Sequence, residues 1–407
     1  MGFVLFLREN ARWLAAGVLL AFVSGFGQTF FIAIFAGHLR AEFGLSDGQW
    51  GWAYTAGTLA SAALMLWTGG LTDRFRVRNL GSWVLVALAL ACVAMSLNRA
   101  AWALPIIIFA LRFTGQGMTS HTAIVAMARW FVANRGRALA VAGLGYALAE
   151  ALMPMIYVAA LRLFGWRELW LVSAAVVVLG VPALRALLSY ERTPQSMAAG
   201  SQAPGMGGRH WTRAEALRHW LIWALMPALL APPAFFTAFF FQQVHLAGVK
   251  GWDHLQLVTL FPLFPLAGVA ASFGFGWSID RFGARKLMGV YQLGLAAGYL
   301  VLALTDTLLA AAVALALMGV TSGGQGTLPN AFWAEYYGTR NIGSIKAVIT
   351  AVLVLGSAIG PGLSGALIDR GVMFPAQMLA IAAYTVLASL GAWVAVVRAG
   401  RELPRAP

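Results

Sequence analysis

A charged ten-residue segment that occurs twice places the strongest constraint on this chain. The copies run from Gly69 to Arg78 and from Gly276 to Arg285, and both read Gly-x-x-x-Asp-Arg-Phe-x-x-Arg. Their aspartates, Asp73 and Asp280, are 207 positions apart in a chain of 407 residues. Each copy lies where one long apolar segment ends and the next begins. A polar hinge repeated at half-chain spacing predicts two homologous halves.

The segments that flank the hinges are too apolar for a soluble protein. Hydrophobic residues make up 60% of the chain and charged residues only 10%, which predicts an integral membrane protein. Because the apolar runs are continuous and do not alternate, the spans are predicted to be helices and not the strands of a barrel. The lipid bilayer is therefore the first expected partner.

Counting about 20 apolar residues as one span, the sequence predicts twelve transmembrane helices. The first six are expected over residues 13–36, 50–71, 79–97, 101–128, 137–162 and 167–189. The second six are expected over residues 219–245, 254–279, 286–304, 307–334, 343–368 and 374–398. The predicted fold class is an all-α membrane protein, with residues 1–189 and 219–407 forming two pseudo-symmetric six-helix bundles.

A long polar connection over residues 190–218 separates the two predicted bundles. It is rich in Pro, Gly, Ser and Arg, and this composition is typical of a flexible linker. At its end, Thr212 and Glu215 have the spacing of a capping box. We therefore expect a cytoplasmic linker that ends in a short amphipathic helix on the membrane surface.

The distribution of basic residues predicts the orientation of the chain. With both termini in the cytoplasm, 21 of the 28 lysines and arginines lie on the cytoplasmic side, six lie on the other side, and Arg112 lies within a span. This asymmetry satisfies the positive-inside rule and favours a bacterial-type inner membrane. It also accounts for the net charge of +14 without a nucleic-acid partner. No cleavable signal peptide is expected.

Several chemistries have no support in the sequence. Cys92 is the single cysteine, which excludes disulfides and cysteine-based metal sites. The glycine-rich stretches lack the Gly-Lys-Ser/Thr of a nucleotide-binding loop. An intramembrane enzyme built on Glu150 and His121 would lack a nucleophile or a metal-ligand cluster. We expect neither a cofactor nor a resident metal, and no enzyme activity.

The internal repeat extends beyond the hinge and carries a family resemblance. Gly115-Gln116-Gly117 recurs as Gly324-Gln325-Gly326, and Pro154 recurs as Pro361. Twelve helices in two sets of six, a central loop and a doubled hinge resemble the major facilitator superfamily. Within it, five stretches are similar to the monocarboxylate transporter and oxalate/formate antiporter group. They are Ala128–Phe131, Arg135–Arg137, Trp211–Trp220, Ala334–Gly338 and Ile359–Gly362.

This resemblance implies a monomeric secondary transporter that moves a small organic anion by alternating access. Two departures from the family pattern limit what can be carried over. The first hinge has Arg76 where the pattern has glycine. The anion carriers of the group have a basic residue in the eighth span or a lysine in the eleventh. Here residues 255–279 carry no charge, and Lys346 lies near the start of the eleventh span.

Arg112 and Glu150 are the ionisable residues that lie deep within predicted spans. Hydrocarbon penalises a buried charge by at least about 2.5 to 3.5 kcal/mol, which makes both residues candidates for function. They lie near the membrane midplane on neighbouring helices, so they could form an ion pair. Protonation of Glu150 would then release Arg112 to hold a substrate carboxylate, and transport would be proton-coupled. The alternative is a static pair that braces the N-terminal half.

Uncharged side chains in the spans complete the predicted substrate site. Gln116 and Thr119 follow Arg112 at helical spacing, which predicts one shared face. A local helix break is expected at Pro232-Pro233, followed by an aromatic wall. The predicted substrate-binding residues are Gln28, Thr29, Arg112, Gln116, Phe235, Phe239, Thr321, Gln325 and Asn330. The alternative is that such polar groups bond between helices.

Charged residues around the two hinges are predicted to form a cytoplasmic gate. Their expected role is conformational: ion-pair networks hold the halves together while the outer side is open. The predicted gate residues are Asp73, Arg74, Arg78, Arg129, Arg135, Asp280, Arg281, Arg285 and Glu335.

The sequence thus favours a proton-coupled carrier of a small organic anion, with a monocarboxylate as the first candidate. The closest alternative is a proton-driven exporter of amphipathic or cationic compounds, in which Glu150 attracts a cation. A receptor or sensor would need an appended soluble domain, which we do not find in the sequence.

Overall fold

The computed structural model describes residues 3–131, 134–190, 205–338 and 341–402. Contacts between residues divide the chain into two compact units, residues 1–199 and 200–407. The division falls within the predicted linker, of which residues 191–204 lie outside the described residues. The described residues contain helices and no strands, which confirms the predicted all-α fold.

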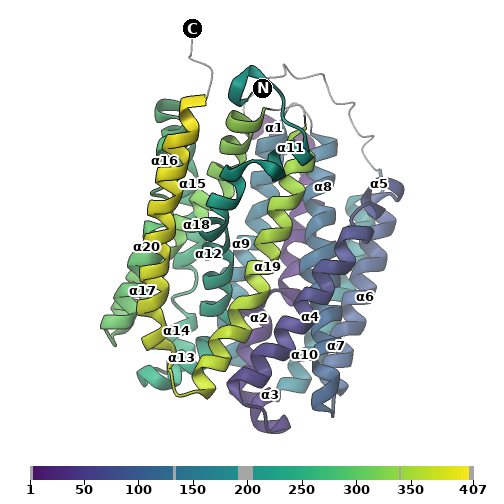
Figure 1. The fold of residues 1–407 in the computed structure, drawn as a ribbon. Helices are drawn as coiled ribbons and strands as arrows, with labels where there is room; N and C mark the ends of the chain where they lie inside the picture. The colour runs from purple at the N-terminus through teal and green to yellow at the C-terminus, as the bar shows by residue number, and fades with distance from the viewer. Residues whose placement is uncertain (1–2, 132–133, 191–204, 339–340, 403–407) are drawn as a thin grey trace. The chain divides into compact units, whose positions relative to one another are not determined.

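The first unit contains a broken first helix followed by five further spans (Figure 1). Its elements are α1 (Phe3–Val23), η1 (Ser24–Gly27), α2 (Thr29–Ile32), η2 (Ala33–Phe35), α3 (Ala36–Phe43), α4 (Asp47–Thr68), α5 (Leu71–Arg74), α6 (Val77–Leu97), η3 (Ala101–Ala103), α7 (Leu104–Leu111), the π-helix η4 (Arg112–Thr119), α8 (Ser120–Trp130), α9 (Arg135–Ala160) and α10 (Trp166–Leu187).

The second unit repeats this order of spans after a short surface helix. Its elements are η5 (Met206–Gly208), α11 (Arg213–Arg218), α12 (Trp220–Phe241), α13 (Gln243–Lys250), α14 (His254–Val258), α15 (Leu263–Phe282), α16 (Ala284–Leu287), α17 (Leu293–Leu304), α18 (Leu308–Tyr337), α19 (Ile342–Asp369), α20 (Phe374–Ala399) and η6 (Gly400–Glu402). Helix α11 begins with the capping box expected at Thr212 and Glu215.

The duplication read from the hinges is visible in how the helices pack. In the first unit, α1 packs on α9, α6 packs on α10, and α4 packs on α7 and η4. The second unit repeats these pairings, with α12 on α19, α17 on α20, and α15 on α18. Counted along the chain, both units therefore pair their first span with their fifth, their third with their sixth, and their second with their fourth.

Among the described residues, ten helices are long and apolar enough to cross a membrane. The other two predicted spans correspond to α4, which has 22 residues and several buried polar ones, and to α17, which has 12 apolar residues. The largest boundary error concerns the first span. The sequence predicts residues 13–36, but α1 begins at Phe3 and the helix is interrupted after Val23.

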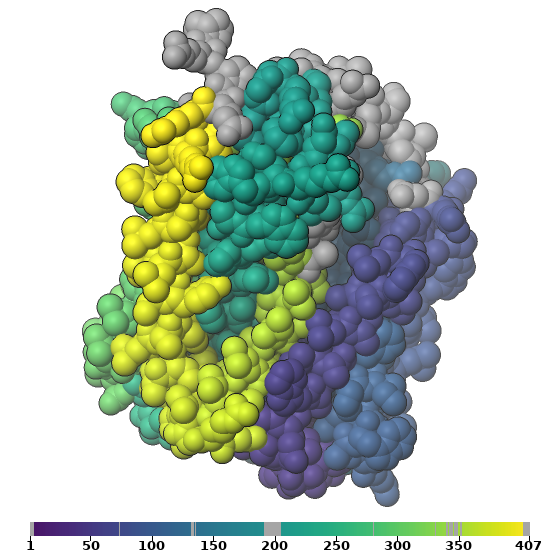
Figure 2. All heavy atoms as spheres, viewed as in Figure 1, coloured from purple at the N-terminus to yellow at the C-terminus, as the bar shows by residue number. Residues whose placement is uncertain are grey.

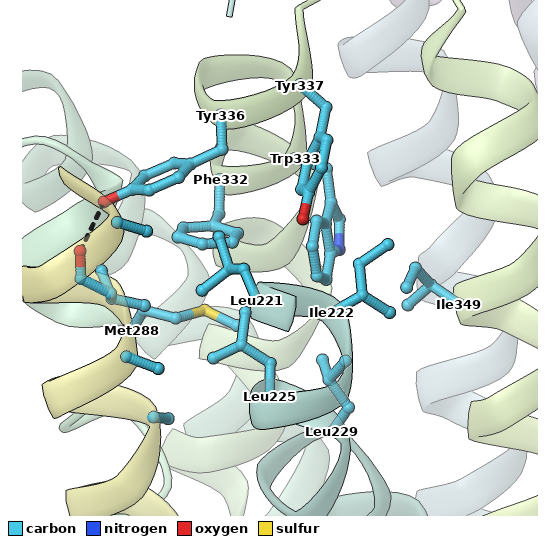
Figure 3. Close-up of a cluster of buried hydrophobic side chains, with 14 of the residues drawn as sticks. Leu221, Ile222, Leu225, Leu229, Met288, Phe332, Trp333, Tyr336, Tyr337 and Ile349 are labelled. Atoms are coloured by element: carbon cyan, nitrogen blue, oxygen red, sulfur yellow. Dashed lines mark hydrogen bonds between the residues drawn. The ribbon is translucent and has the colours of Figure 1, made fainter. Parts of the chain in front are cut away.

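Each unit buries large side chains inside and leaves apolar side chains outside. In the second unit, Phe332 and Trp333 pack with Leu221 and Leu225 of α12, and the Tyr336 hydroxyl donates to the Val396 carbonyl (Figure 3). Helix α20, coloured yellow, lies at the surface in the space-filling view (Figure 2). Its exposed side chains include Leu387 and Trp393. Such an apolar exterior suits a helix that faces lipid.

The predicted break at Pro232-Pro233 is wrong. Helix α12 continues through both prolines to Phe241. Neighbouring helices support its backbone, because Tyr299 donates a hydrogen bond to the Phe235 carbonyl and Tyr384 donates one to the Pro227 carbonyl. Packing against other helices allows proline inside a continuous transmembrane helix, because neighbouring groups satisfy the backbone.

Candidate functional site

The interruption of the first helix provides the wall of the candidate site. Gln28 has an extended backbone, with φ −88° and ψ 156°, between η1 and α2. Its carbonyl accepts the N–H groups of Phe31 and Ile32, which starts the next helical turn. The break exposes the Gly27 carbonyl and the Thr29 side chain to a neighbouring helix, and both contact Arg112.

A close contact between two glycines brings η1 against η4. A Cβ atom at Gly27 would overlap the carbonyl oxygen of Leu111, and one at Gly115 would lie 2.6 Å from the Gly27 Cα. No side chain fits in this contact without a shift of the backbone. Gly115 belongs to the repeated Gly-Gln-Gly motif, so the motif serves the approach of η1 to η4 in the first unit.

Helix η4 is a π-helix. Residues that would share one face of an α-helix therefore do not all share one face here. The Thr119 hydroxyl donates to the Thr114 carbonyl, five residues earlier, at 2.7 Å. Thr119 is fully buried and bonds within its own helix, so the predicted common face of Arg112, Gln116 and Thr119 is wrong at Thr119. The wider turn of a π-helix removes the spacing on which that prediction was based.

Arg112 is the first residue of η4 and is completely buried. Its Nη1 donates to the Gly27 carbonyl at 3.2 Å and to the Thr29 hydroxyl at 3.4 Å. Its guanidinium lies 5.3 Å from the centre of the Tyr54 ring, which gives a cation–π contact. Its Nε and Nη2 have no hydrogen-bond partner among the described residues.

Thr29 and Tyr54 share a hydrogen bond of 2.5 Å, in which either oxygen could be the donor. This bond joins α2 to α4 at the edge of the guanidinium. Arg112 is therefore held by an aromatic ring, a hydroxyl and a backbone carbonyl, all uncharged. Such partners position a guanidinium without neutralising its charge.

Glu150 does not pair with Arg112, so the predicted ion pair is wrong for this structure. The carboxyl is buried on α9 and accepts a hydrogen bond from the Tyr146 hydroxyl at 3.4 Å. Ion pairs among the described residues do not include Arg112 with Glu150. The Nη1 of Arg112 instead donates to Gly27 and Thr29 at the break in the first helix. Tyr146 interacts electrostatically with both Arg112 and Glu150.

The remaining predicted residues of the first unit lie beside Arg112 in sequence or in space. Gln28 is buried at the break in the first helix, and Thr29 contacts Arg112 directly. Gln116 is partly buried on η4, four residues after Arg112. The structure thus brings together Arg112, Thr29 and the backbone next to Gln28.

In the second unit, Thr321 and Gln325 have different surroundings. Thr321 is fully buried; its hydroxyl donates to the Tyr291 carbonyl and accepts the N–H of Leu295. It therefore serves helix packing in this structure. Gln325 lines a cavity of about 180 Å³. The side chain of Asn330 lies outside the described residues.

The cavity beside Gln325 lies within the second unit, between α12, α18 and α19. It is lined by Leu229, Tyr291, Gln325, Gly326, Pro329, Trp333, Ile349, Thr350 and Leu353. No charged side chain is among the described residues that line it. The Trp333 Nε1 is buried and has no hydrogen-bond partner among the described residues. An aromatic cavity of this kind suits an uncharged group better than an anion.

The two predicted phenylalanines do not form one wall. Phe239 is 1% exposed and packs edge-on against Phe240, while Phe235 packs against Tyr299 and Tyr384. Phe239 therefore belongs to the interior of the second unit, whereas Phe235 is partly exposed. That these two rings line a substrate path stays a prediction.

The predicted gate residues of the first unit lie around α5. Arg129 donates to the Thr72 carbonyl at 2.8 Å, and His121 bonds with the Gly69 carbonyl at 3.2 Å. Arg74 is exposed, and Arg78 lines a cavity at the start of α6. The side chains of Asp73 and Arg135 lie outside the described residues.

The predicted gate residues of the second unit also gather at their hinge. Glu335 accepts the backbone N–H of Ala284 and interacts electrostatically with Arg285. Arg281 contacts the rings of Trp277 and Phe282. The side chain of Asp280 lies outside the described residues.

A comparison with protein families decides what kind of protein carries these features. The family model described as Major Facilitator Superfamily matches residues 17–278 and, in a second match, residues 251–407. The chain belongs to the Major Facilitator Superfamily. With its span-length apolar helices, this facilitator is an integral multi-pass membrane protein.

Two curated proteins show low sequence identity to this facilitator. A protein named probable nitrate/nitrite antiporter NarK1, from Thermus thermophilus, is 26% identical over 300 residues, which cover 69% of this chain and 63% of the relative. A protein named probable sulfoacetate transporter SauU, from Cupriavidus necator, is 28% identical over 281 residues, which cover 62% of this chain and 61% of the relative. The matches thus span less than two thirds of either relative.

Solved structures agree on the fold over nearly the full length. A bacterial homolog of the human lysosomal transporter Spinster, in an inward-facing and unoccupied conformation, superposes with a TM-score of 0.70 at 16% identity and covers 98% of this chain and 99% of its own. A mutant of the nucleoside transporter NupG gives a TM-score of 0.70 at 13% identity, covering 94% and 99%. At such identities the likeness concerns the facilitator fold alone.

The predicted site of this facilitator omitted residues that the structure places beside Arg112 and Glu150. Tyr54 and Gly27 contact Arg112, and Tyr146 contacts Glu150. One signal was available in the sequence, because Tyr146 precedes Glu150 by four residues and so lies on the same helical face. The Gly27 carbonyl gave no signal, since backbone groups acquire partners only when a helix breaks.

Proposed function

We propose that this facilitator is a secondary active transporter of a small organic anion and that Arg112 is the cation that binds the anion. One observation carries the proposal: Arg112 is completely buried within a span, no described carboxylate lies within ion-pair distance, and two of its N–H-bearing nitrogens have no partner. A buried charge without a counter-ion is costly in a membrane protein. A bound anion would offset that cost.

The names of the relatives support an anionic substrate. Nitrate, nitrite and sulfoacetate, which appear in those names, are all anions. We favour a monocarboxylate, because one guanidinium can bind one carboxylate through two parallel hydrogen bonds. The aromatic ring of Tyr54 beside the guanidinium adds apolar surface for the rest of a small organic molecule.

Proton coupling is assigned to Glu150 through Tyr146. The ionised carboxylate of Glu150 accepts a hydrogen bond from the Tyr146 hydroxyl. The protonated carboxyl has no negative charge and does not need this hydrogen bond. Protonation thus frees the Tyr146 hydroxyl, which also interacts electrostatically with Arg112, to donate to a bound anion. Proton and anion would then favour each other's binding, as linkage requires for symport.

The whole-molecule features of the proposal follow the superfamily. The two units would alternate access to the site, with the hinge residues around Asp73 and Asp280 as the cytoplasmic gate. We place the chain in a bacterial-type inner membrane with both termini in the cytoplasm. The reason is that 21 of the 28 lysines and arginines lie on the same side of the membrane as the termini. We expect a monomer to be the working unit.

Uptake by proteoliposomes tests the proposal. A panel of monocarboxylates, sulfonated carboxylates and nitrate is offered with and without an inward proton gradient. The proposal predicts saturable uptake of at least one organic anion, increased by the gradient. Anion uptake that is the same with and without the proton gradient would refute proton coupling. It would not contradict the proposal that the substrate is an anion.

The second candidate, a proton-driven exporter of cations, is favoured by the buried carboxyl of Glu150. Its prediction is opposite in charge: lipophilic cations would bind and be moved, and the anions would not. The same vesicles, loaded with a fluorescent lipophilic cation, distinguish the two. Movement of the cation without movement of any anion would replace the main proposal.

A further inference from the structure

An arginine-lined cavity lies at the junction of α6 and α10, away from Arg112. It has a volume of about 290 Å³ and is lined by Arg76, Arg78, Asn79, Arg185, Leu188 and Ser189. The first three belong to the start of α6, and the last three to the end of α10 and the residues that follow it. No acidic side chain is among the described residues that line it.

Arg76 is the residue that departs from the hinge pattern. The second hinge keeps glycine at the corresponding place, where Gly283 has φ +78°, a conformation that favours glycine. Arg76 instead has φ −65° and precedes the first turn of α6. The replacement therefore needs no backbone strain, and it adds a third arginine to the cavity.

The other groups around the cavity add to its attraction for an anion. The Arg78 Nε is buried and has no hydrogen-bond partner among the described residues. The cavity lies at the N-terminus of a 21-residue helix, where backbone N–H groups and the helix dipole favour negative charge. A fourth arginine, Arg12, donates to the Ser189 hydroxyl at 2.5 Å on its rim.

The position of the cavity narrows the identity of that anion. It lies where two transmembrane spans end, residues 77–97 and 166–187, which is the depth of phospholipid headgroups. Below it, α6 exposes Trp83, Val86 and Leu90 on one face, and α10 exposes Val176 and Leu179. Apolar exposed side chains under a basic cavity match acyl chains under a phosphate.

We infer that this cavity binds the phosphate group of an anionic phospholipid, with Arg76, Arg78 and Arg185 as its ligands. Basic pockets between transmembrane helices bind such headgroups through charge-assisted hydrogen bonds. The site is separate from the Arg112 site and does not depend on the proposed transport function. Its chemistry is that of a phosphodiester, which free phosphate shares in part.

The test measures lipid binding to the full chain in detergent after delipidation. Native mass spectrometry or a thermal-shift titration compares phosphatidylglycerol, phosphatidylcholine and inorganic phosphate. We expect phosphatidylglycerol to bind tightly, phosphatidylcholine to bind weakly, and phosphate to compete only at high concentration. Arg76→Gly and Arg185→Gln should each weaken the binding of phosphatidylglycerol about five-fold.

Arg99→Gln is the matched control, since Arg99 is exposed just beyond the other end of α6, and it should leave binding unchanged. Arg76→Gly restores the residue of the second hinge and Arg185→Gln changes an exposed side chain, so two independent variants report on the site. Equal binding of phosphatidylglycerol and phosphatidylcholine would overturn the inference. So would unchanged phosphatidylglycerol binding in both variants, or tight phosphate binding without lipid binding.

Discussion

At the residue scale, the candidate site depends on Gly27 because its carbonyl accepts from Arg112 and its missing side chain lets η1 approach η4. Gly27→Ala should destabilise the protein by about 1 to 3 kcal/mol, since the added Cβ overlaps the Leu111 carbonyl. It should also abolish anion uptake. Thermal unfolding in detergent measures the first effect and proteoliposome uptake the second.

Gly143→Ala provides the control for that substitution. Gly143 lies within α9, and a Cβ there would meet no atom within 4 Å, so stability and uptake should stay the same. If Gly27→Ala unfolds at the same temperature as Gly143→Ala, the close contact between η1 and η4 is not a requirement of the fold.

Glu150 carries the proposed proton coupling. Glu150→Gln keeps the size of the side chain and is neutral at every pH, as the protonated carboxyl is, so it cannot titrate. We expect anion uptake by this variant to lose its dependence on pH and on an imposed proton gradient. Exchange of anion across the vesicle membrane should be preserved. Uptake measured between pH 5.5 and 8 checks this, and a pH dependence equal to that of the unchanged protein would exclude Glu150 as the coupling group.

The sequence predicts which buried residues carry charge but not which groups contact them. Arg112 and Glu150 stand out because charge is rare in apolar spans. Their partners do not, since Tyr54, Tyr146 and the Gly27 carbonyl are ordinary groups until the fold assembles them. The predicted ion pair failed for the same reason: sequence places both residues at similar depth but does not say which way each nitrogen or oxygen is turned.

At the element scale, an ion pair outside the spans ties α3 to α10. Both oxygens of Glu42 bind Arg167, at 2.5 Å each, and Oε2 also accepts from Trp166 at 2.9 Å. Arg167 also donates to the Asn98 carbonyl at the end of α6. The hydrogen bond from Arg167, together with that from Trp166, lowers the pKa of Glu42 below its usual value near 4.5.

Because the pKa of Glu42 is lower in the folded state, this tie stabilises the protein above about pH 4.5 and is lost as pH falls through the lowered value. Glu42→Gln should therefore reduce the free energy of unfolding at pH 7 by at most about 1 kcal/mol, since the pair is partly exposed to solvent. Below about pH 4 the difference should shrink. Thermal unfolding at both pH values measures it.

Glu9→Gln removes an exposed carboxyl elsewhere in the first unit and should show no such difference between the two pH values. If Glu42→Gln unfolds at the same temperature as the unchanged protein at pH 7, the tie between α3 and α10 contributes nothing measurable.

The interrupted first helix and the π-helix η4 could not be predicted from the sequence. Hydropathy predicts helices over residues 13–36 and 101–128, but the structure has an interrupted helix and a π-helix there. The two irregular stretches meet at the contact between Gly27 and Gly115, which joins residues far apart in the chain. The opposite error occurred at Pro232-Pro233, where local chemistry predicts a break and neighbouring helices keep α12 continuous.

At the scale of the whole molecule, the doubled hinge predicted the repeated packing of the two units because duplicated sequences fold alike. It did not predict how the copies differ. In the first unit a buried arginine meets uncharged partners, whereas the second unit offers an uncharged aromatic cavity beside Gln325. Such a difference depends on single residues, to which a repeat pattern is insensitive.

The most direct test of the account is equilibrium binding of the transported anion to purified protein, with Arg112 intact, as Arg112→Lys and as Arg112→Gln. We predict a loss of affinity of at least about ten-fold in Arg112→Gln, the cost of removing a charged hydrogen-bonding group, and a smaller loss in Arg112→Lys. Arg99→Gln should bind as the unchanged protein does. Affinity in Arg112→Gln equal to that of the unchanged protein would contradict the central claim that Arg112 binds the anion.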